Sequence, residues 1–211
     1  MELAELTVRG FTEEIASASP APGGGSAAAL AGAVGAALTA MVSGLTLGRK
    51  KYEAVQELVL RAQAQADALR KRLLAAMEQD TQTFLQVSAA YAMPKQTPEE
   101  KQARSSAIDQ GLKACTQPPL AVMQLCAEGL ELLESLLGKT NATAASDFGV
   151  ACLSLRAGMQ GAWLNVCINT GSLHDAAFAA GARAAGQKLL DTGLPRADRC
   201  YAAMLAVCSE G

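Results

Sequence analysis

A long stretch without any charged residue, from Ile15 to Gly48, constrains the fold more than any other feature of this sequence. Within it, small residues recur at every fourth position, at Ala28, Gly32, Ala36, Ala40 and Gly44. Positions four apart lie on one face of an α-helix, and small side chains there allow another backbone to approach closely. The stretch therefore predicts a helix that packs tightly against a neighbour.

Two environments would suit such a helix. It is long enough to cross a bilayer, and small residues at this spacing are known from membrane helices. However, alanine and glycine make up much of its length, it stands alone in the sequence, and no aromatic belt flanks it. We therefore favour a buried helix in a water-soluble protein, without a membrane partner. Because the small face from Ala28 to Gly44 needs a backbone to pack on, we also expect a homodimer.

The composition favours helices over sheets. Half of the residues are hydrophobic but only 4% are aromatic, so alanine and leucine supply much of the apolar surface. The charges nearly balance, with 18 Lys and Arg against 20 Asp and Glu, and a net charge of −2 gives no electrostatic reason to expect nucleic-acid binding. We expect a single domain spanning residues 1–211, which is long enough to bury a full core.

The cysteines indicate a reducing compartment. None of the six forms a C-x-x-C pair, and the first residues lack the basic and apolar regions of a secretion signal. We interpret the cysteines as reduced packing residues and expect a cytoplasmic protein.

Helical spacing continues through the rest of the chain. Apolar residues from Tyr52 to Tyr91 predict one long helix, or two in line, that ends near Pro94. Residues Thr97–Glu100 are typical of a helix start, with an N-cap residue, a proline at the first helical position and a glutamate three residues after the cap. We expect this helix to stop or bend at Pro118 and Pro119.

Three more helices are expected near the C-terminus. They cover residues 146–170, 173–191 and 195–209, with Ser172 as the cap of the second and Thr192–Pro195 as a break before the third. Because no alternating strand pattern accompanies them, the predicted class is all-α.

Asp80 departs from this pattern of apolar faces. It lies between Met77 and Phe84 on the apolar stripe of the long predicted helix, so we expect its carboxyl group to be at least partly buried. A buried carboxylate must be paired, hydrogen-bonded or functional. Asp80 is therefore either a site residue or a structural break in the stripe.

One face of the helix at 146–170 is small in the middle and polar at both ends. Its residues are Asp147, Ala151, Ser154, Gly158, Ala162, Asn165 and Asn169. Such a face suits a wall for a flat ligand, with the asparagines as hydrogen-bonding groups. The alternatives are a helix cap for Asp147 and a close helix contact for the small residues.

Two other motifs carry less information. The basic cluster in "GRKKY", which includes Lys50 and Lys51, could bind a carboxylate or a phosphate or could be a solvated charge run. His174 is the sole histidine, and without a cysteine cluster it does not predict a metal site.

Four parts of the sequence together resemble the formiminotransferase-cyclodeaminase C-terminal family. They are "FTEEIASASPAPGGGSAAALAGAVGAALTAMVSGLTLGRKKY", Asp80 with Phe84, "YAMPKQTPEEKQAR" and "NATAASDFGVACLSLRAGMQGAWLNVCIN". The family includes the cyclodeaminase half of a bifunctional enzyme and stand-alone methenyltetrahydrofolate cyclohydrolases. The resemblance implies an elongated antiparallel helical bundle that dimerises and binds a reduced folate, with no cofactor beyond that substrate.

The resemblance also implies roles for the residues singled out above. The glycine loop would let the backbone approach the folate and offer N–H groups, through Pro22, Gly23, Gly24, Gly25 and Ser26. The carboxylates near the reacting carbon would be Asp80 and Asp147. The pterin or the amide would be held by Arg156, Asn165 and Asn169, and the glutamate tail by Lys50 and Lys51.

Two alternatives stay open at this point. The sequence does not separate a formimidoyltetrahydrofolate cyclodeaminase, which releases ammonia, from a methenyltetrahydrofolate cyclohydrolase, which adds water. A protein of another class, a non-catalytic helical dimer that serves as an interaction module, would use the small-residue helix as its interface.

Overall fold

The structure is a computed structural model that describes residues 2–210, and within that range it contains helices and no strand. Two short 3₁₀ turns, η1 (Leu3–Glu5) and η2 (Lys50–Val55), precede helices α1 (Val8–Ala16) and α3 (Gln56–Tyr91). A third, η3 (Ala142–Ala144), leads into α5. The remaining helices are α2 (Gly24–Gly44), α4 (Pro98–Ser135), α5 (Ala145–Gly171) and α6 (Ala176–Ser209). The predicted all-α class is confirmed.

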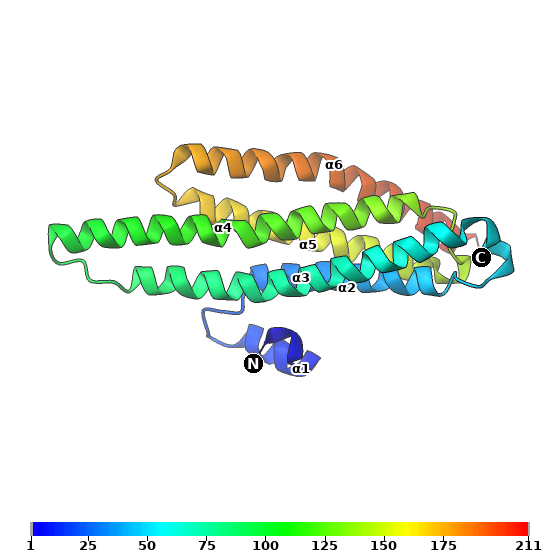
Figure 1. The fold of residues 1–211 in the computed structure, drawn as a ribbon, viewed down its shortest axis with the longest axis horizontal. Helices are drawn as coiled ribbons and strands as arrows, with labels where there is room; N and C mark the ends of the chain where they lie inside the picture. Colours follow the sequence, from blue (N-terminus) through cyan, green and yellow to red (C-terminus); the bar gives the residue numbers. More distant parts are fainter. Residues whose placement is uncertain (1, 211) are drawn as a thin grey trace.

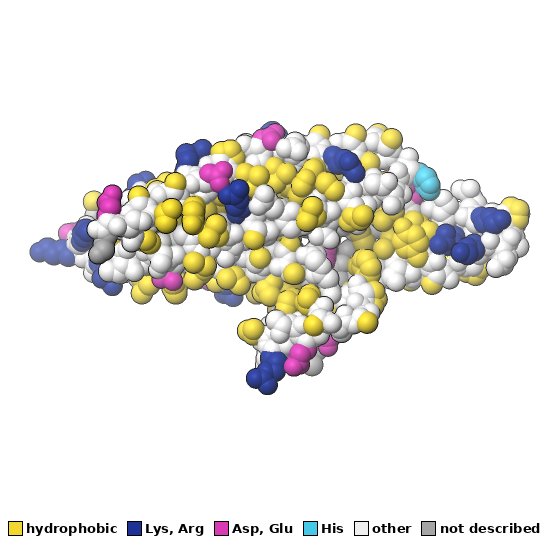
Figure 2. Space-filling model, turned by 180° about the vertical axis from the view of Figure 1, so that it is seen from behind, with side chains coloured by type: hydrophobic (Ala, Val, Ile, Leu, Met, Phe, Trp, Pro, Cys, Tyr) yellow, Lys and Arg dark blue, Asp and Glu magenta, His cyan; other side chains and the backbone are white. Residues whose placement is uncertain are grey.

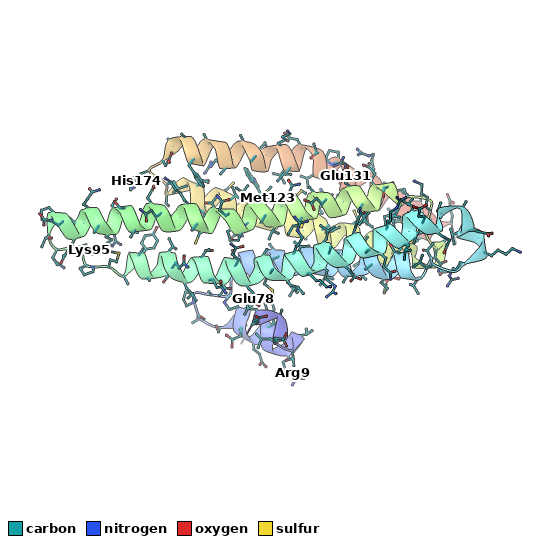
Figure 3. The ribbon with its side chains drawn as sticks, viewed as in Figure 1. Arg9, Glu78, Lys95, Met123, Glu131 and His174 are labelled. Atoms are coloured by element: carbon teal, nitrogen blue, oxygen red, sulfur yellow. The ribbon has the colours of Figure 1, made fainter. Side chains whose placement is uncertain are left out.

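The long helices α2 to α6 lie side by side in an elongated body, and η1 with α1 forms an arm that projects from it (Figure 1). Lys95, in the turn between α3 and α4, and His174, between α5 and α6, mark one end, which we call the Lys95 end (Figure 3). At the opposite end, the Lys50 end, Thr46 Oγ1 accepts a hydrogen bond from the N–H of Asn141 at 2.9 Å, and Tyr52 Oη accepts one from the N–H of Ala142 at 3.1 Å.

The small face of α2 packs on α5 of the same chain. A Cβ atom built on Gly35 would lie 2.8 Å from the carbonyl oxygen of Ala151, and one on Gly158 would lie 2.8 Å from the carbonyl oxygen of Ala28. The two backbones therefore touch, which explains the small residues at this spacing. We expected a second chain on this face, but α5 and other helices of the same chain cover it, so the face gives no argument for a dimer.

By length and composition α2 is also the one helix among residues 2–210 that could span a bilayer. Most of it is buried against the other helices, and core helices of soluble proteins pass the same test. The other core side chains come from all the long helices and include Leu73, Met123, Leu130, Phe148 and Leu155, none of them exposed by more than 1%.

Helix α4 begins as predicted but does not stop at its prolines. Thr97 Oγ1 accepts a hydrogen bond from the N–H of Glu100 at 3.2 Å, and the Glu100 carboxylate accepts one from the N–H of Thr97 at 3.1 Å, which completes a capping box. Pro118 and Pro119 are buried inside this helix, which continues to Ser135. Burial against neighbouring helices outweighs the loss of two backbone donors at this point.

Helix α6 likewise runs through the predicted break. Asp175, not Ser172, is its N-cap, because Asp175 Oδ1 accepts a hydrogen bond from the N–H of Phe178 at 3.0 Å. Past Pro195, Arg196 and Arg199 donate hydrogen bonds to the carboxylate of Glu134 in α4 at 3.1 and 2.6 Å. These contacts hold the second half of α6 in line with the first, so tertiary packing overrides the local sequence signal.

Candidate functional site

The glycine loop leads directly into helix α2. Gly23 is the N-cap residue, its carbonyl oxygen accepts a hydrogen bond from the N–H of Ala27 at 3.0 Å, and no side chain caps this helix start. The first backbone N–H groups of α2 therefore point out of the helix without intrahelical partners, and the helix dipole favours negative charge in front of them.

Asp80, in the second half of α3, lies in front of this helix start. The Ser26 hydroxyl donates a hydrogen bond to Asp80 Oδ2 at 2.9 Å and lies 3.1 Å from Thr81 Oγ1. Burial raises the pKa of Asp80 above its ordinary value of 3.8, although the hydroxyl and the backbone N–H of Ser26 act in the opposite direction. The predicted partial burial of this carboxyl group is confirmed. It has no cationic partner among its hydrogen bonds in the described chain.

Gly25 makes this approach possible. A Cβ atom at position 25 would collide with the Asp80 carboxyl group, lying 2.6 Å from its carbon atom and closer still to Oδ1. At Gly23 and Gly24, by contrast, a Cβ atom would meet nothing within 4 Å. Only the last of the three glycines is therefore required by the contact between α2 and α3.

Two asparagines of α5 complete the polar part of the site. Asn165 Nδ2 donates to the carbonyl oxygen of Gly161 at 3.0 Å, and Asn169 Nδ2 donates to the carbonyl oxygen of Cys115, in α4, at 2.8 Å. Since a carbonyl oxygen only accepts hydrogen bonds, these contacts fix the orientation of both amides. The Oδ1 atom of each is left to accept a hydrogen bond from a ligand.

These groups line a cavity of about 340 Å³. Its polar wall comprises the loop glycines and Asp80, Thr81, Asn165, Asn169 and Ser172, and its apolar wall includes Phe84, Val87, Tyr91, Leu112, Cys115 and Ile168. Asp80 is the one charged side chain that lines it within residues 2–210. A small cavity with an apolar wall and few convergent polar groups is typical of a ligand site.

The aromatic residues of this wall were not predicted. Phe84 and Tyr91 follow Asp80 on the same apolar stripe of α3, which we expected to lie in the core. In the structure their side chains are 39% and 47% exposed and line the cavity. Their spacing of four and eleven residues from Asp80 was the signal that could have placed them beside the carboxylate.

Cys115 and Leu112 of α4 also line the cavity. No local sequence pattern distinguishes them from other core residues of that helix. Burial raises the pKa of the Cys115 thiol, and the charge of Asp80 raises it further. The thiol therefore stays protonated near neutral pH and is unsuited to act as a nucleophile.

The structure brings together seven of the predicted site residues. Six of them line the cavity: Gly23, Gly24, Gly25, Asp80, Asn165 and Asn169. The seventh, Ser26, donates a hydrogen bond to Asp80. Pro22 is buried next to the glycines but does not line the cavity.

Arg156 lies elsewhere. It forms an ion pair with Asp198 of α6, and Nε donates to Gln160 Oε1 at 3.4 Å. At 1.5 Å per helical residue, its backbone is about 20 Å along α5 from Asn169. The position of Arg156 therefore does not support its predicted role in holding the pterin or the amide in this cavity.

Asp147, Lys50 and Lys51 are at the Lys50 end of the molecule. Asp147 is in the first turn of α5, about 33 Å along that helix from Asn169. Lys50 and Lys51 follow the C-terminus of α2, whose N-terminus carries the glycine loop, so the length of that helix, about 30 Å, separates them from the cavity. The structure does not bring these three residues to the cavity within one chain.

No metal centre is found in the described part of the chain, since no group of three or more of its His, Cys, Asp and Glu side chains is arranged so that it could hold a metal ion. The side chain of His174 is largely exposed, and the backbone N–H of this residue donates a hydrogen bond to Asp109 Oδ1 at 2.8 Å. All six cysteines are free.

Comparison with known proteins gives consistent matches. The family model described as formiminotransferase-cyclodeaminase matches residues 7–188. The chain is 43% identical over 173 residues to methenyltetrahydrofolate cyclohydrolase of Methylorubrum extorquens, covering 82% of this chain and 83% of that one. It is 34% identical to formimidoyltransferase-cyclodeaminase of Mus musculus over 83% of this chain, but over 32% of that longer protein. A crystal structure of formiminotetrahydrofolate cyclodeaminase from Thermotoga maritima superposes with a TM-score of 0.81 at 26% identity, covering 98% of this chain and 97% of the other.

Proposed function

Because the chain belongs to the formiminotransferase-cyclodeaminase family, we propose that it is an enzyme acting on the one-carbon unit between N5 and N10 of tetrahydrofolate. The observation that carries the proposal is the partly buried Asp80 carboxyl group, which is the one charged side chain lining the cavity among residues 2–210. A carboxylate in a pocket of low polarity stabilises a cation strongly, and the one-carbon unit is a delocalised cation in the methenyl form.

We place the cyclohydrolase reaction first, because the 43% identical relative with similar length bears that name. Water attacks the methenyl carbon and forms a tetrahedral carbinolamine, losing one proton to a base. The bond between that carbon and N5 then breaks, N5 takes up the remaining hydroxyl proton, and the 10-formyl form results. Asp80 would stabilise the cationic carbon before attack and accept the proton of the water, for which a raised pKa is an advantage.

The cyclodeaminase reaction is the second candidate, and the structural neighbour from Thermotoga maritima favours it. Here N10 attacks the carbon of the protonated N5-formimino group, and ammonia leaves as the methenyl cation forms. Asp80 would take the proton from N10 and return it to the departing nitrogen. The same carboxyl group therefore serves either reaction.

The rest of the cavity provides the contacts that a pterin ring needs. The free N–H groups at the start of α2 would donate to a ring carbonyl oxygen, and Oδ1 of Asn165 and Asn169 would accept from ring N–H groups. The rings of Phe84 and Tyr91 offer flat apolar surfaces beside Asp80. We expect no cofactor beyond the folate, and we expect the enzyme to work in the cytoplasm.

We propose further that the working form is a homodimer of this elongated antiparallel bundle. An outer face of α2 and α5 supports this dimer. Large apolar side chains are exposed on α2 and α5, and the view from behind shows apolar side chains gathered over this side of the body (Figure 2). They are Val34, Met41 and Leu45 on α2, and Val150, Leu153, Leu164 and Ile168 on α5.

A dimer through this face would also bring close to the cavity those predicted site residues that lie far from it within one chain. A twofold axis perpendicular to α5 sets the Lys50 end of one copy beside the Lys95 end of the other. Asp147, Lys50 and Lys51 would then approach the cavity from the partner. Their site roles stay predictions that depend on this arrangement.

Two assays on one preparation test the proposed activity. Loss of the methenyltetrahydrofolate absorbance above the uncatalysed rate identifies the cyclohydrolase, and release of ammonia from 5-formiminotetrahydrofolate identifies the cyclodeaminase. Absence of both activities, with no thermal shift on adding tetrahydrofolate derivatives, would contradict the proposal and favour the interaction module.

A further inference from the structure

The two prolines inside α4 leave backbone carbonyl groups without their usual helical donors. In an α-helix, the carbonyl of residue i accepts from the N–H of residue i+4. Pro118 and Pro119 have no N–H, so the carbonyls of Ala114 and Cys115 each lose that partner. Buried carbonyl groups are nearly always satisfied by another donor.

The carbonyl that Pro119 frees is the one that holds Asn169. Asn169 Nδ2 donates to the carbonyl oxygen of Cys115 at 2.8 Å, across the contact between α5 and α4. Cys115 and Asn169 both line the cavity, and Asn169 is only partly buried. With its Nδ2 engaged, this amide presents its oxygen to a ligand as an acceptor.

We infer that Pro119 is a positioning residue for substrate binding. By removing the N–H at position 119, it reserves the Cys115 carbonyl for Asn169, and this fixes the Asn169 amide with Oδ1 toward the cavity. Oδ1 then accepts a hydrogen bond from an N–H group of the substrate, such as the ring N–H or the amino group of a reduced pterin. The identity of that donor rests on the proposed function, whereas the anchoring of the amide does not.

Pro118 offers a matched control in the same helix turn. It frees the carbonyl of Ala114, and no hydrogen bond from a cavity side chain to that carbonyl is found among the described residues. Pro118→Ala and Pro119→Ala restore one helical donor each, and both remove a proline from a helix interior, where proline is unfavourable. Only the second change creates a competitor for Asn169.

The experiment measures KM, kcat and the melting temperature of both variants, together with the Kd for 5-formyltetrahydrofolate as a stable probe. We expect Pro119→Ala to raise KM and Kd by roughly three- to tenfold, the effect of one weakened hydrogen bond. Its kcat should stay close to that of the parent, and its melting temperature should be equal or higher. Pro118→Ala should leave KM, Kd and kcat unchanged.

A double-mutant cycle separates positioning from general disturbance of the helix. In the Asn169→Ala background, Pro119→Ala should add no further loss of affinity, because the amide that it displaces is absent. An additive loss, or equal effects of Pro118→Ala and Pro119→Ala, would overturn the inference, as would an unchanged Kd.

A crystal structure of the Pro119→Ala variant tests the anchoring without any folate. The new N–H at position 119 should donate to the Cys115 carbonyl, and the Asn169 amide should turn away from it. If the parent protein binds no folate, the proposed function fails, yet this structure still decides the anchoring. An Asn169 amide that keeps its contact with Cys115 in the variant would show that Pro119 does not position it.

Discussion

At the scale of single residues, the Asp80 carboxyl group carries the chemistry that we propose. If it stabilises the cationic carbon or moves a proton, both Asp80→Asn and Asp80→Leu should lower turnover by roughly a hundredfold or more. The methenyltetrahydrofolate absorbance assay and the ammonia assay measure this loss. Asp67→Asn, a change to a more exposed carboxylate of the same helix that pairs with Arg70, should retain full activity. Unchanged turnover in Asp80→Asn would remove Asp80 from the site.

The same residue should make stability depend on pH. Because burial raises the pKa of Asp80 in the folded chain, the folded state binds this proton more tightly than the unfolded state does. Below the ordinary value of 3.8 both states are protonated and Asp80 has no net effect. As the pH rises through the raised pKa, the ionised group increasingly disfavours the folded state.

The melting temperature of Asp80→Asn should therefore match that of the parent at low pH and exceed it at neutral pH. For a chain of this length, each kcal/mol of stabilisation corresponds to roughly 2–4 °C. Calorimetry of both proteins across this pH range measures the difference. A difference that stays constant with pH would mean that ionisation of Asp80 costs the fold nothing.

At the scale of elements, substitutions in the glycine loop at the start of helix α2 can test ligand binding and helix packing separately. Gly24→Val should abolish folate binding and leave the helix content nearly intact, because the new side chain meets open space at the cavity wall. Gly25→Val should instead lower the melting temperature, because its side chain collides with the Asp80 carboxyl group. Circular dichroism and a folate-binding titration distinguish the two. Unfolding of Gly24→Val would show that this glycine serves a turn and not a ligand.

The local sequence pattern predicted a helix correctly where its apolar periodicity or its capping residues determine its bounds. The pattern failed where contacts between distant residues determine whether a helix continues. The stripe that ends at Tyr91 and the cap at Thr97 predicted α3 and the start of α4. The breaks expected at Pro118 and Pro195 do not occur, because contacts such as those from Arg196 and Arg199 to Glu134 hold the helices in line. For the site, Asp80 was found because it violates an apolar stripe, whereas Cys115 could not be found, because only the packing of α4 on α5 brings it there.

At the scale of the whole molecule, the exposed apolar stripe on α5 should hold two copies together. Leu164, which is 69% exposed, lies near the cavity but does not line it. We expect the parent protein to sediment as a dimer and Leu164→Glu to sediment as a monomer with an unchanged helical spectrum, since a charge on an apolar interface is unfavourable. Leu60→Glu, at a similarly exposed leucine of α3, should remain dimeric. A monomeric parent at micromolar concentration would contradict the dimer.

A cavity lined, within residues 2–210, by one charged side chain that is a carboxylate also discriminates between the ligands that enter and leave it. It retains a cation more tightly than a neutral molecule of the same shape. In hydrolysis, the charged methenyl form is consumed and the uncharged formyl form departs, so the same carboxylate that captures the reactant favours turnover by releasing the product. In deamination the methenyl cation is the product, and the carboxylate slows its departure. Asp80 would therefore make inhibition by the product strong in deamination and weak in hydrolysis, and initial rates measured with added product would show this difference.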